Sequence, residues 1–147
     1  MLRRCNLRLP IYCRDLGCHI DGYLAQVAHT IVVGADPTKK VTGKKADVIV
    51  ATRMCFEAAL RLLKEGNLNK QITDAIAEIS AVYKTNPLEG VLSHRVKKHM
   101  IDGDEVIINK QTTEQKVEEH KFDKYEVYVL DVILSTGEGK PKEVIKV

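Results

Sequence analysis

The chain has 147 residues, of which 44% are hydrophobic and 29% are charged. This composition fits one compact globular domain with a real core, and it excludes an intrinsically disordered protein. The 23 basic and 20 acidic residues give a formal net charge of +3, which is too small by itself to establish a polyanionic partner. No apolar run approaches the roughly 18 residues that a membrane span needs, so we expect a soluble protein.

The cysteine pattern argues against a structural zinc site. Cys5, Cys13, Cys18 and Cys55 include no CxxC pair and no Cys/His quartet. We therefore expect free, buried thiols in a reducing compartment. The Arg-rich start of the chain is short, lacks serine and is interrupted by Pro10, so it does not predict a targeting peptide.

Residues 16–33 alternate between polar and apolar side chains and are rich in β-branched residues. This pattern predicts a β-hairpin whose turn is Asp21-Gly22. The following "GADPTKKVTG", residues 34–43, is rich in turn formers and predicts a loop.

Two helices are expected next. Apolar residues recur at three- and four-residue intervals from Val48 to Leu63, which predicts an amphipathic helix with Gly66 as its C-cap. A second periodic stretch runs from Ile72 to Val82, with Asn69 as a plausible N-cap and an end at Asn86-Pro87.

The last third mixes short strands with glycine turns. His94 and His99 are expected in a loop, and residues 110–124 in a polar, solvated and mobile excursion. Residues 125–139 predict a buried strand that carries Asp131, a carboxylate that costs several kcal/mol unless it is paired, hydrogen-bonded or coordinated. The expected fold class is α+β, one domain in which helices cover one face of a mainly antiparallel sheet.

Three quoted motifs carry a family resemblance. They are "DLGxHxDGYxAxxAxT" from residue 15, "EGxLSHxxxxHxIDG" from residue 89 and "EVYxxDVxxSxGEGK" from residue 126, with a helix pair ending in "NP" between the first two. Their order and spacing closely resemble the proliferation-associated, ErbB receptor-binding family, a group of non-peptidase relatives of the type II methionine aminopeptidases. The resemblance implies a partial "pita-bread" (creatinase/methionine aminopeptidase-like) fold, with a curved antiparallel sheet covered by helices. It also implies a divergent segment 1–14 and a single aminopeptidase-like domain, 15–147, that is incomplete at both ends.

The same resemblance implies a set of vestigial metal-ligand positions. Two divalent metals in the active relatives are held by two aspartates, a histidine and two glutamates, and four of these five places correspond to Asp15, Gln26, His94 and Asp131. The last glutamate would lie beyond Val147.

The charges and lengths of these side chains predict that the two divalent metals are not bound. Two metals about 3.5 to 4 Å apart need bridging carboxylates to offset their repulsion. Gln26 supplies a neutral oxygen, and Asp131 is one methylene shorter than glutamate while ligand distances must hold within about 0.2 Å. We therefore expect no metal, no other cofactor and no catalytic residue.

Several alternatives remain open at this stage. Asp15, His94 and Asp131 could hold a single metal with a water molecule, or each could be an ordinary satisfied polar residue. No other catalytic arrangement is evident, and "GEGK" at 137–140 lacks the leading glycine and following Ser/Thr of a phosphate loop.

Basic residues form two clusters beside glycine-containing loops, which are the candidate nucleic-acid-binding residues: Lys39, Lys40, Lys44, Lys45, Arg95, Lys97 and Lys98. Clusters of this kind can follow a phosphate backbone, although ordinary solvated surface is the alternative. Only 5% of residues are aromatic, which disfavours stacking on single-stranded bases and favours structured RNA recognised by shape.

The expected function is that of a catalytically inactive aminopeptidase-fold protein that binds RNA or ribosomes and protein partners in growth and translation control. The resemblance implies partners such as a receptor tail or transcription regulators, and a location in the cytoplasm and the nucleus or nucleolus. The alternatives are a metal-dependent methionine aminopeptidase and a non-functional truncated fragment with exposed sheet edges.

Overall fold

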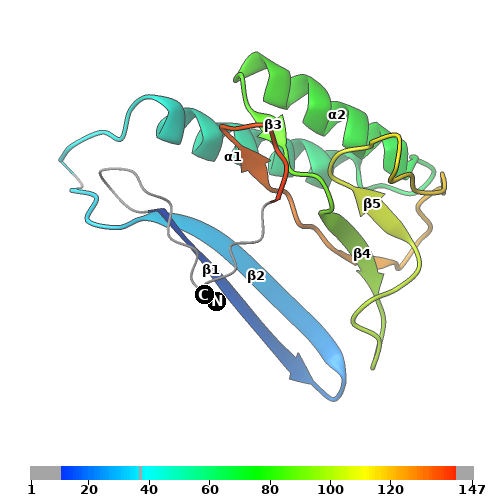
Figure 1. The fold of residues 1–147 in the computed structure, drawn as a ribbon. Coiled ribbons are helices and arrows are strands. Elements are labelled where there is room, and N and C mark those ends of the chain that lie inside the picture. The colour runs from blue at the N-terminus through cyan, green and yellow to red at the C-terminus, as the bar shows by residue number, and fades with distance from the viewer. Residues whose placement is uncertain (1–10, 37, 142–147) are drawn as a thin grey trace, which may run out of the picture.

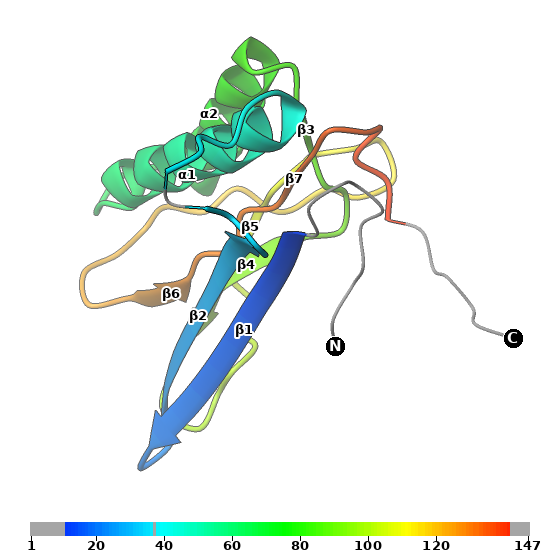
Figure 2. The ribbon, with the colours of Figure 1, turned by 90° about the vertical axis from the view of Figure 1, so that its left-hand side faces the viewer.

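The structure is a computed structural model that describes residues 11–36 and 38–141. Its elements follow in the order β1 (Ile11–Ile20), β2 (Tyr23–Val32), α1 (Lys44–Leu62), α2 (Asn69–Val82), β3 (Asn86–Pro87), β4 (Leu92–Val96), β5 (Val106–Ile108), β6 (Val127–Val129) and β7 (Leu134–Ser135). The helices α1 and α2 pack together over the small sheets, while the β1–β2 hairpin extends away from them (Figures 1 and 2).

The predicted hairpin is confirmed, and its first strand is longer than expected because it begins at Ile11 and not at Leu16. β1 and β2 pair antiparallel over ten residues each, and Leu16 faces Val27 across the pair. Asp21 and Gly22 form the turn with φ angles of 50° and 85°, the left-handed values that a type I′ turn requires. β1 begins at Ile11, so strand pairing extends into the segment 1–14; the proposed domain boundary stays a prediction.

Both predicted helices are present, but three of their expected ends are wrong. Helix α1 ends at Leu62, four residues before Gly66, which lies instead in the following turn and donates its N–H to the carbonyl of Phe122. Leu68, not Asn69, is the N-cap of α2. This helix ends at Val82, before Asn86-Pro87, because those two residues form strand β3.

The helix pair encloses the core through small residues on α1. Ala51, Cys55 and Ala59, spaced four apart, are fully buried and allow α2 to approach closely with Ile72 and Ile76. Burial raises the pKa of the Cys55 thiol to about 11. The expectation of buried thiols holds for Cys55 but is wrong for the exposed Cys13 and Cys18, while Cys5 lies outside the described residues.

The mixed α+β class is confirmed, although the strands form three small sheets. The sheets have the orders β1-β2, β3-β7 and β5-β4-β6, and each pairing is antiparallel. His94 lies in strand β4 and not in a loop. The expected last strand is also divided, because the chain leaves β6 after Val129 and pairs again only at Leu134.

Residues 110–124 are irregular in backbone and mostly exposed, as their polarity predicts, but the segment is anchored to the core. Phe122 is 2% exposed and belongs to the core cluster, and its N–H donates to the carbonyl of Asn67. Asn69 is also buried, and its amide donates to the carbonyls of Val106 and Glu118 at 3.1 and 2.9 Å. The segment is irregular in backbone but anchored at its end.

This anchoring predicts a large effect of Phe122→Ala. Removing the buried ring should lower the free energy of unfolding by about 3 to 5 kcal/mol, through lost burial and the cavity left behind. Tyr125→Ala is the matched control, since that ring is 99% exposed and its removal should change stability by no more than about 0.5 kcal/mol. Denaturant unfolding curves would measure both, and equal midpoints for the two variants would contradict the anchoring.

Candidate functional site

Asp15 and Gln26 lie on the same face of the hairpin. Asp15 faces Ala28 and Gly17 faces Gln26 in the β1–β2 register. Cross-strand partners share a face and alternate residues return to it, so Asp15 and Gln26 are diagonal neighbours. The Gln26 side chain extends over Gly17, where a Cβ would lie 3.4 Å from Gln26 Cγ. The first pair of vestigial positions is therefore brought together by strand register alone.

His94 and Asp131 come from the three-stranded sheet. His94 pairs with Val129 on β6, and Asp131 follows two residues later where the chain leaves the sheet. The Ser93 hydroxyl fixes this exit because it accepts the Asp131 N–H at 2.8 Å and donates to the Asp131 carbonyl at 3.3 Å. Sequence reasoning missed Ser93, although its place beside His94 was visible in the "LSH" motif.

The Asp131 carboxyl lies within electrostatic range of Asp15 on the hairpin and of His94 on β4. Burial is the main factor that raises the pKa of the Asp131 carboxyl, the Asp15 charge raises it further, and His94 opposes both. The charges of Asp15 and His94 therefore both act on the Asp131 carboxyl. Asp131 is half-buried and lies near the Asp15 carboxylate. Its ionised form is therefore disfavoured in the folded protein.

The donor set does not fit a dinuclear metal centre. Within residues 11–36 and 38–141, no group of three or more His, Cys, Asp or Glu side chains is arranged to hold a metal ion. The fourth position is the neutral amide of Gln26, which cannot bridge two cations as a carboxylate does. What the residues form is a polar cluster with two carboxylates, one imidazole and one amide.

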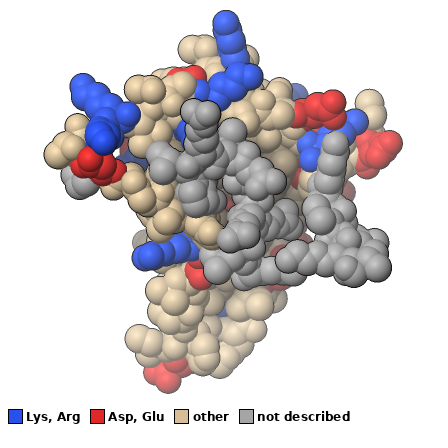
Figure 3. Space-filling view, turned by 60° about the vertical axis from the view of Figure 1, so that its left-hand side comes forward, with Lys and Arg blue, Asp and Glu red and all other residues tan. Residues whose placement is uncertain are grey.

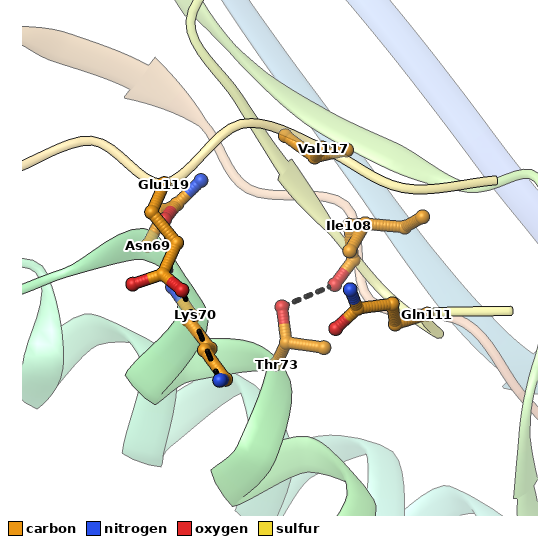
Figure 4. A pocket seen from close by; sticks show the side chains of 7 residues that line it. All are labelled: Asn69, Lys70, Thr73, Ile108, Gln111, Val117 and Glu119. Atoms are coloured by element: carbon orange, nitrogen blue, oxygen red, sulfur yellow. Dashed lines mark hydrogen bonds and ion pairs between the residues drawn. The ribbon is translucent and has the colours of Figure 1, made fainter. Parts of the chain in front are cut away.

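Two hollows lie elsewhere, between α2 and the segments that pack beside it. One is about 60 Å³ and is lined by Asn69, Lys70, Thr73, Ile108, Gln111, Val117 and Glu119, with the Thr73 hydroxyl donating to the Ile108 carbonyl at 2.7 Å (Figure 4). The other is about 350 Å³ and lies between α2 and residues 109–111. Neither is lined by the polar cluster, so neither is evidence about that site.

The basic residues stand apart from one another on the face that Figure 3 shows. On the face shown in Figure 3, Lys and Arg side chains stand in separate groups with acidic and uncharged residues between them. Arg95 is held by Glu105 and by Glu126, the latter at 2.9 Å, and its side chain is 23% exposed. Among the expected nucleic-acid-binding residues, Arg95 therefore has two carboxylate partners, and Lys39 is also paired, with its Nζ 3.8 Å from Asp36.

The tip of the hairpin is attached to the turn after β4. The His99 N–H donates to the Gly22 carbonyl at 2.8 Å, and the His99 ring fills the space that a Cβ at Gly22 would need. Lys98 Nζ lies 5.4 Å from the centre of the Tyr23 ring, a cation–π contact. His99, to which the sequence assigned no role, thus positions the hairpin.

Similar proteins share most of this chain. It is 45% identical over 129 residues to "Proliferation-associated protein A" of Dictyostelium discoideum, which covers 88% of this chain and 34% of that protein. It is 45% identical over 128 residues to "ERBB-3 BINDING PROTEIN 1" of Arabidopsis thaliana, covering 87% and 32%. It is 41% identical over 130 residues to "Curved DNA-binding protein" of Schizosaccharomyces pombe, covering 86% and 33%. The chain spans about a third of the length of these curated relatives.

Solved structures share the fold. A thermophilic Arx1 superposes with a TM-score of 0.82 at 25% identity, over 93% of this chain and 42% of that one. The methionine aminopeptidase of Thermotoga maritima superposes with a TM-score of 0.75 at 21% identity, over 93% and 51%. The fold is therefore the aminopeptidase fold expected from the sequence motifs. The model of metallopeptidase family M24 matches residues 9–128, and the chain belongs to this family.

Proposed function

We propose that this chain is a catalytically inactive member of its family that binds structured RNA or ribosomes and protein partners. The observation that carries the proposal is Gln26, an amide on the same hairpin face as Asp15, where a second carboxylate would be needed to hold two cations. Asp131 does not compensate, because burial and Asp15 both disfavour its charge.

The names of similar proteins support a binding role. Two of them are named for binding, one to ErbB-3 and one to curved DNA, and none of these three names states a peptidase activity. From these names we infer two kinds of partner for this chain. One is a protein, such as a receptor tail or a transcription regulator, and the other is a nucleic acid. A location in the cytoplasm and the nucleus or nucleolus belongs to the same proposal.

The placement of the lysines suits a long, regular polyanion. Lys39 and Lys40 follow the base of β2, whereas Lys98 lies at Tyr23, at the other end of this ten-residue strand. At about 3.3 Å per residue the two clusters are separated by about 30 Å, which is on the order of one turn of a nucleic-acid duplex. A structured RNA could contact both clusters through its phosphates, which gives affinity without base readout.

Divalent metal should not stabilise the protein. With Mn²⁺ or Co²⁺ in excess over a chelated sample, we expect no rise in Tm and no turnover of a methionyl peptide, because only binding to the folded state raises stability. Differential scanning calorimetry and a peptidase assay make the measurement. The contradicting outcome is a metal-dependent rise in Tm together with turnover that His94→Ala abolishes, which would indicate an aminopeptidase.

Asp131→Asn should stabilise the protein at neutral pH in the presence of chelator. The pKa of Asp131 is raised in the folded state, so the folded protein binds its proton more tightly than the unfolded chain does. That contribution to stability is complete below the unfolded pKa of about 3.9 and is lost as the pH rises through the folded pKa.

Wild type and Asp131→Asn should therefore diverge as the pH rises from 4 to 7, with the variant more stable at the upper end. Each unit by which the folded pKa exceeds the unfolded value contributes about 1.4 kcal/mol to that difference. Urea unfolding at several pH values measures it. A variant that is less stable than wild type at pH 7 would show that the charged carboxylate is favourably held.

The affinity for RNA should fall steeply as the salt concentration rises, and it should depend on the lysines of the first basic cluster. Each phosphate contact changes the slope of log K against log salt by about 0.9, so replacing Lys39, Lys40, Lys44 and Lys45 by glutamine should make the slope shallower by up to about 3.6. The control replaces the same number of exposed lysines outside the clusters, Lys64, Lys84, Lys116 and Lys121. Fluorescence anisotropy with a short RNA duplex gives both slopes, and equal slopes would remove the clusters from the proposal.

A further inference from the structure

The loop between β2 and α1 carries a hydroxyl group in the middle of the first basic cluster. Thr42 has lysines two and three positions away on both sides, which are Lys40 and Lys39 before it and Lys44 and Lys45 after it. The Thr42 side chain is exposed. Burial of four ammonium groups so close together is strongly unfavourable, so this loop stays in solvent whatever else packs against the fold.

The backbone around Thr42 is open to another protein. Residues 40–42 belong to neither a helix nor a strand, and within residues 11–36 and 38–141 they make no hydrogen bond or ion pair. A Cβ built at the next residue, Gly43, would meet nothing within 4 Å. Thr38 in the same loop differs, because its hydroxyl donates to Asp36 Oδ1 at 2.7 Å and its N–H donates to the same atom at 2.9 Å. The accessible and unengaged hydroxyl is that of Thr42.

We propose that Thr42 is the acceptor for a serine/threonine protein kinase that selects basic residues, and that its phosphorylation weakens RNA binding by the first basic cluster. The second half rests on the proposed function, since it takes RNA phosphate as the ligand of the cluster. Protein kinases choose their substrates partly by the pattern of charge around the acceptor. Lysines two and three positions before Thr42 form such a pattern, on a segment that no regular structure holds.

The modification is a simple phosphoryl transfer from ATP. The Thr42 Oγ forms a bond to the γ-phosphorus, and the bond from that phosphorus to the bridging oxygen breaks as ADP leaves. The hydroxyl proton passes to the catalytic aspartate of the kinase. The kinase and ATP supply everything else that the step needs, so this chain contributes only the hydroxyl and the charges that present it.

The phosphate would offset about half of the local positive charge. Residues 38–45 contain four lysines and no acidic residue, a formal charge of +4, and Lys39 is also paired with Asp36 at 3.8 Å. A phosphothreonine carries about −1.5 to −2 at neutral pH and three strong acceptor oxygens. In the chain it lies two residues from both Lys40 and Lys44, so it would compete with RNA phosphates for their ammonium groups.

The fold itself should tolerate the phosphate. Thr42 directly precedes Gly43, the N-cap of α1, and no side chain caps the start of this helix. Negative charge beside a helix N-terminus is favourable. Phosphorylation should therefore leave Tm no lower than in the unmodified protein, and a loss of RNA binding would report charge and not unfolding.

Phosphate incorporation tests the site without RNA. The full chain is incubated with ATP and the catalytic subunit of cyclic-AMP-dependent protein kinase, and its peptides are analysed by mass spectrometry. We expect phosphate at Thr42, none there in Thr42→Val, and undiminished incorporation in the matched control Thr38→Val. Lys39→Gln combined with Lys40→Gln should slow the reaction by at least about tenfold, because the charge pattern is lost. Absence of phosphate at Thr42 in the wild type, or an equal rate in the lysine variant, overturns the site and leaves RNA binding standing.

RNA titration tests the consequence. Fluorescence anisotropy with a short RNA duplex should give a slope of log K against log salt that is shallower by about 1.8 after phosphorylation, about 0.9 for each of two phosphate contacts. Thr42→Val treated with the same kinase is the control and should keep the slope of the unmodified chain. Equal slopes for the modified and unmodified wild type overturn the regulation. An unmodified chain that binds no RNA overturns the regulation together with the proposed function, while the mass spectra decide the site separately.

Discussion

Two buried asparagines hold the irregular third of this protein against its helices. Asn69 donates to the carbonyls of Val106 and Glu118, and its own oxygen accepts the N–H groups of Lys70 and His120. Asn109 donates to the carbonyls of Leu88 and Ile133 at 3.1 and 2.8 Å. Strands β3, β5, β6 and β7 have two or three residues each, so their ladders cannot satisfy the buried backbone of the connecting segments. The amide side chains do so, and the three-stranded sheet keeps its place on α2 as a result.

The polar cluster lies at a junction between two parts of the fold. His94 and Asp131 belong to the part built from the helices and the three-stranded sheet. There the Ser93 hydroxyl fixes the chain at Asp131. Asp15 and Gln26 belong to the hairpin, whose attachment to the body includes the contacts of Gly22 and Tyr23 at its tip. Cations shared between these parts would pull them together, but the neutral amide of Gln26 supplies no charge to offset the repulsion between two such ions. The contacts at the tip therefore matter more here than they would in a site that holds metals.

Local chemistry explains which parts of the fold the sequence predicted. Asp21-Gly22 specifies its own turn, and the apolar spacing of α1 and α2 identifies both helices, because these signals come from residues close in the chain. Asn69 was assigned to a cap because its long-range bonds to Val106 and Glu118 leave no trace nearby in the sequence. Phe122 was placed in a solvated segment because its neighbours are polar, although a single aromatic residue was enough to anchor them. Alternation within the hairpin put Asp15 and Gln26 on one face, whereas the approach of Asp131 came only from the family resemblance.

The hairpin separates two kinds of surface because a strand alternates its side chains. Odd-numbered residues of β1 from Asp15 turn toward the polar cluster, and even-numbered residues from Leu16 to Ile20 form the apolar face. A shift of the register by one residue would exchange the two sets, so the same ladder that places Gln26 beside Asp15 also exposes Leu16 and Val27. Loss of a carboxylate affects only the first surface. The second depends on shape and apolar area, which an amide at Gln26 leaves unchanged.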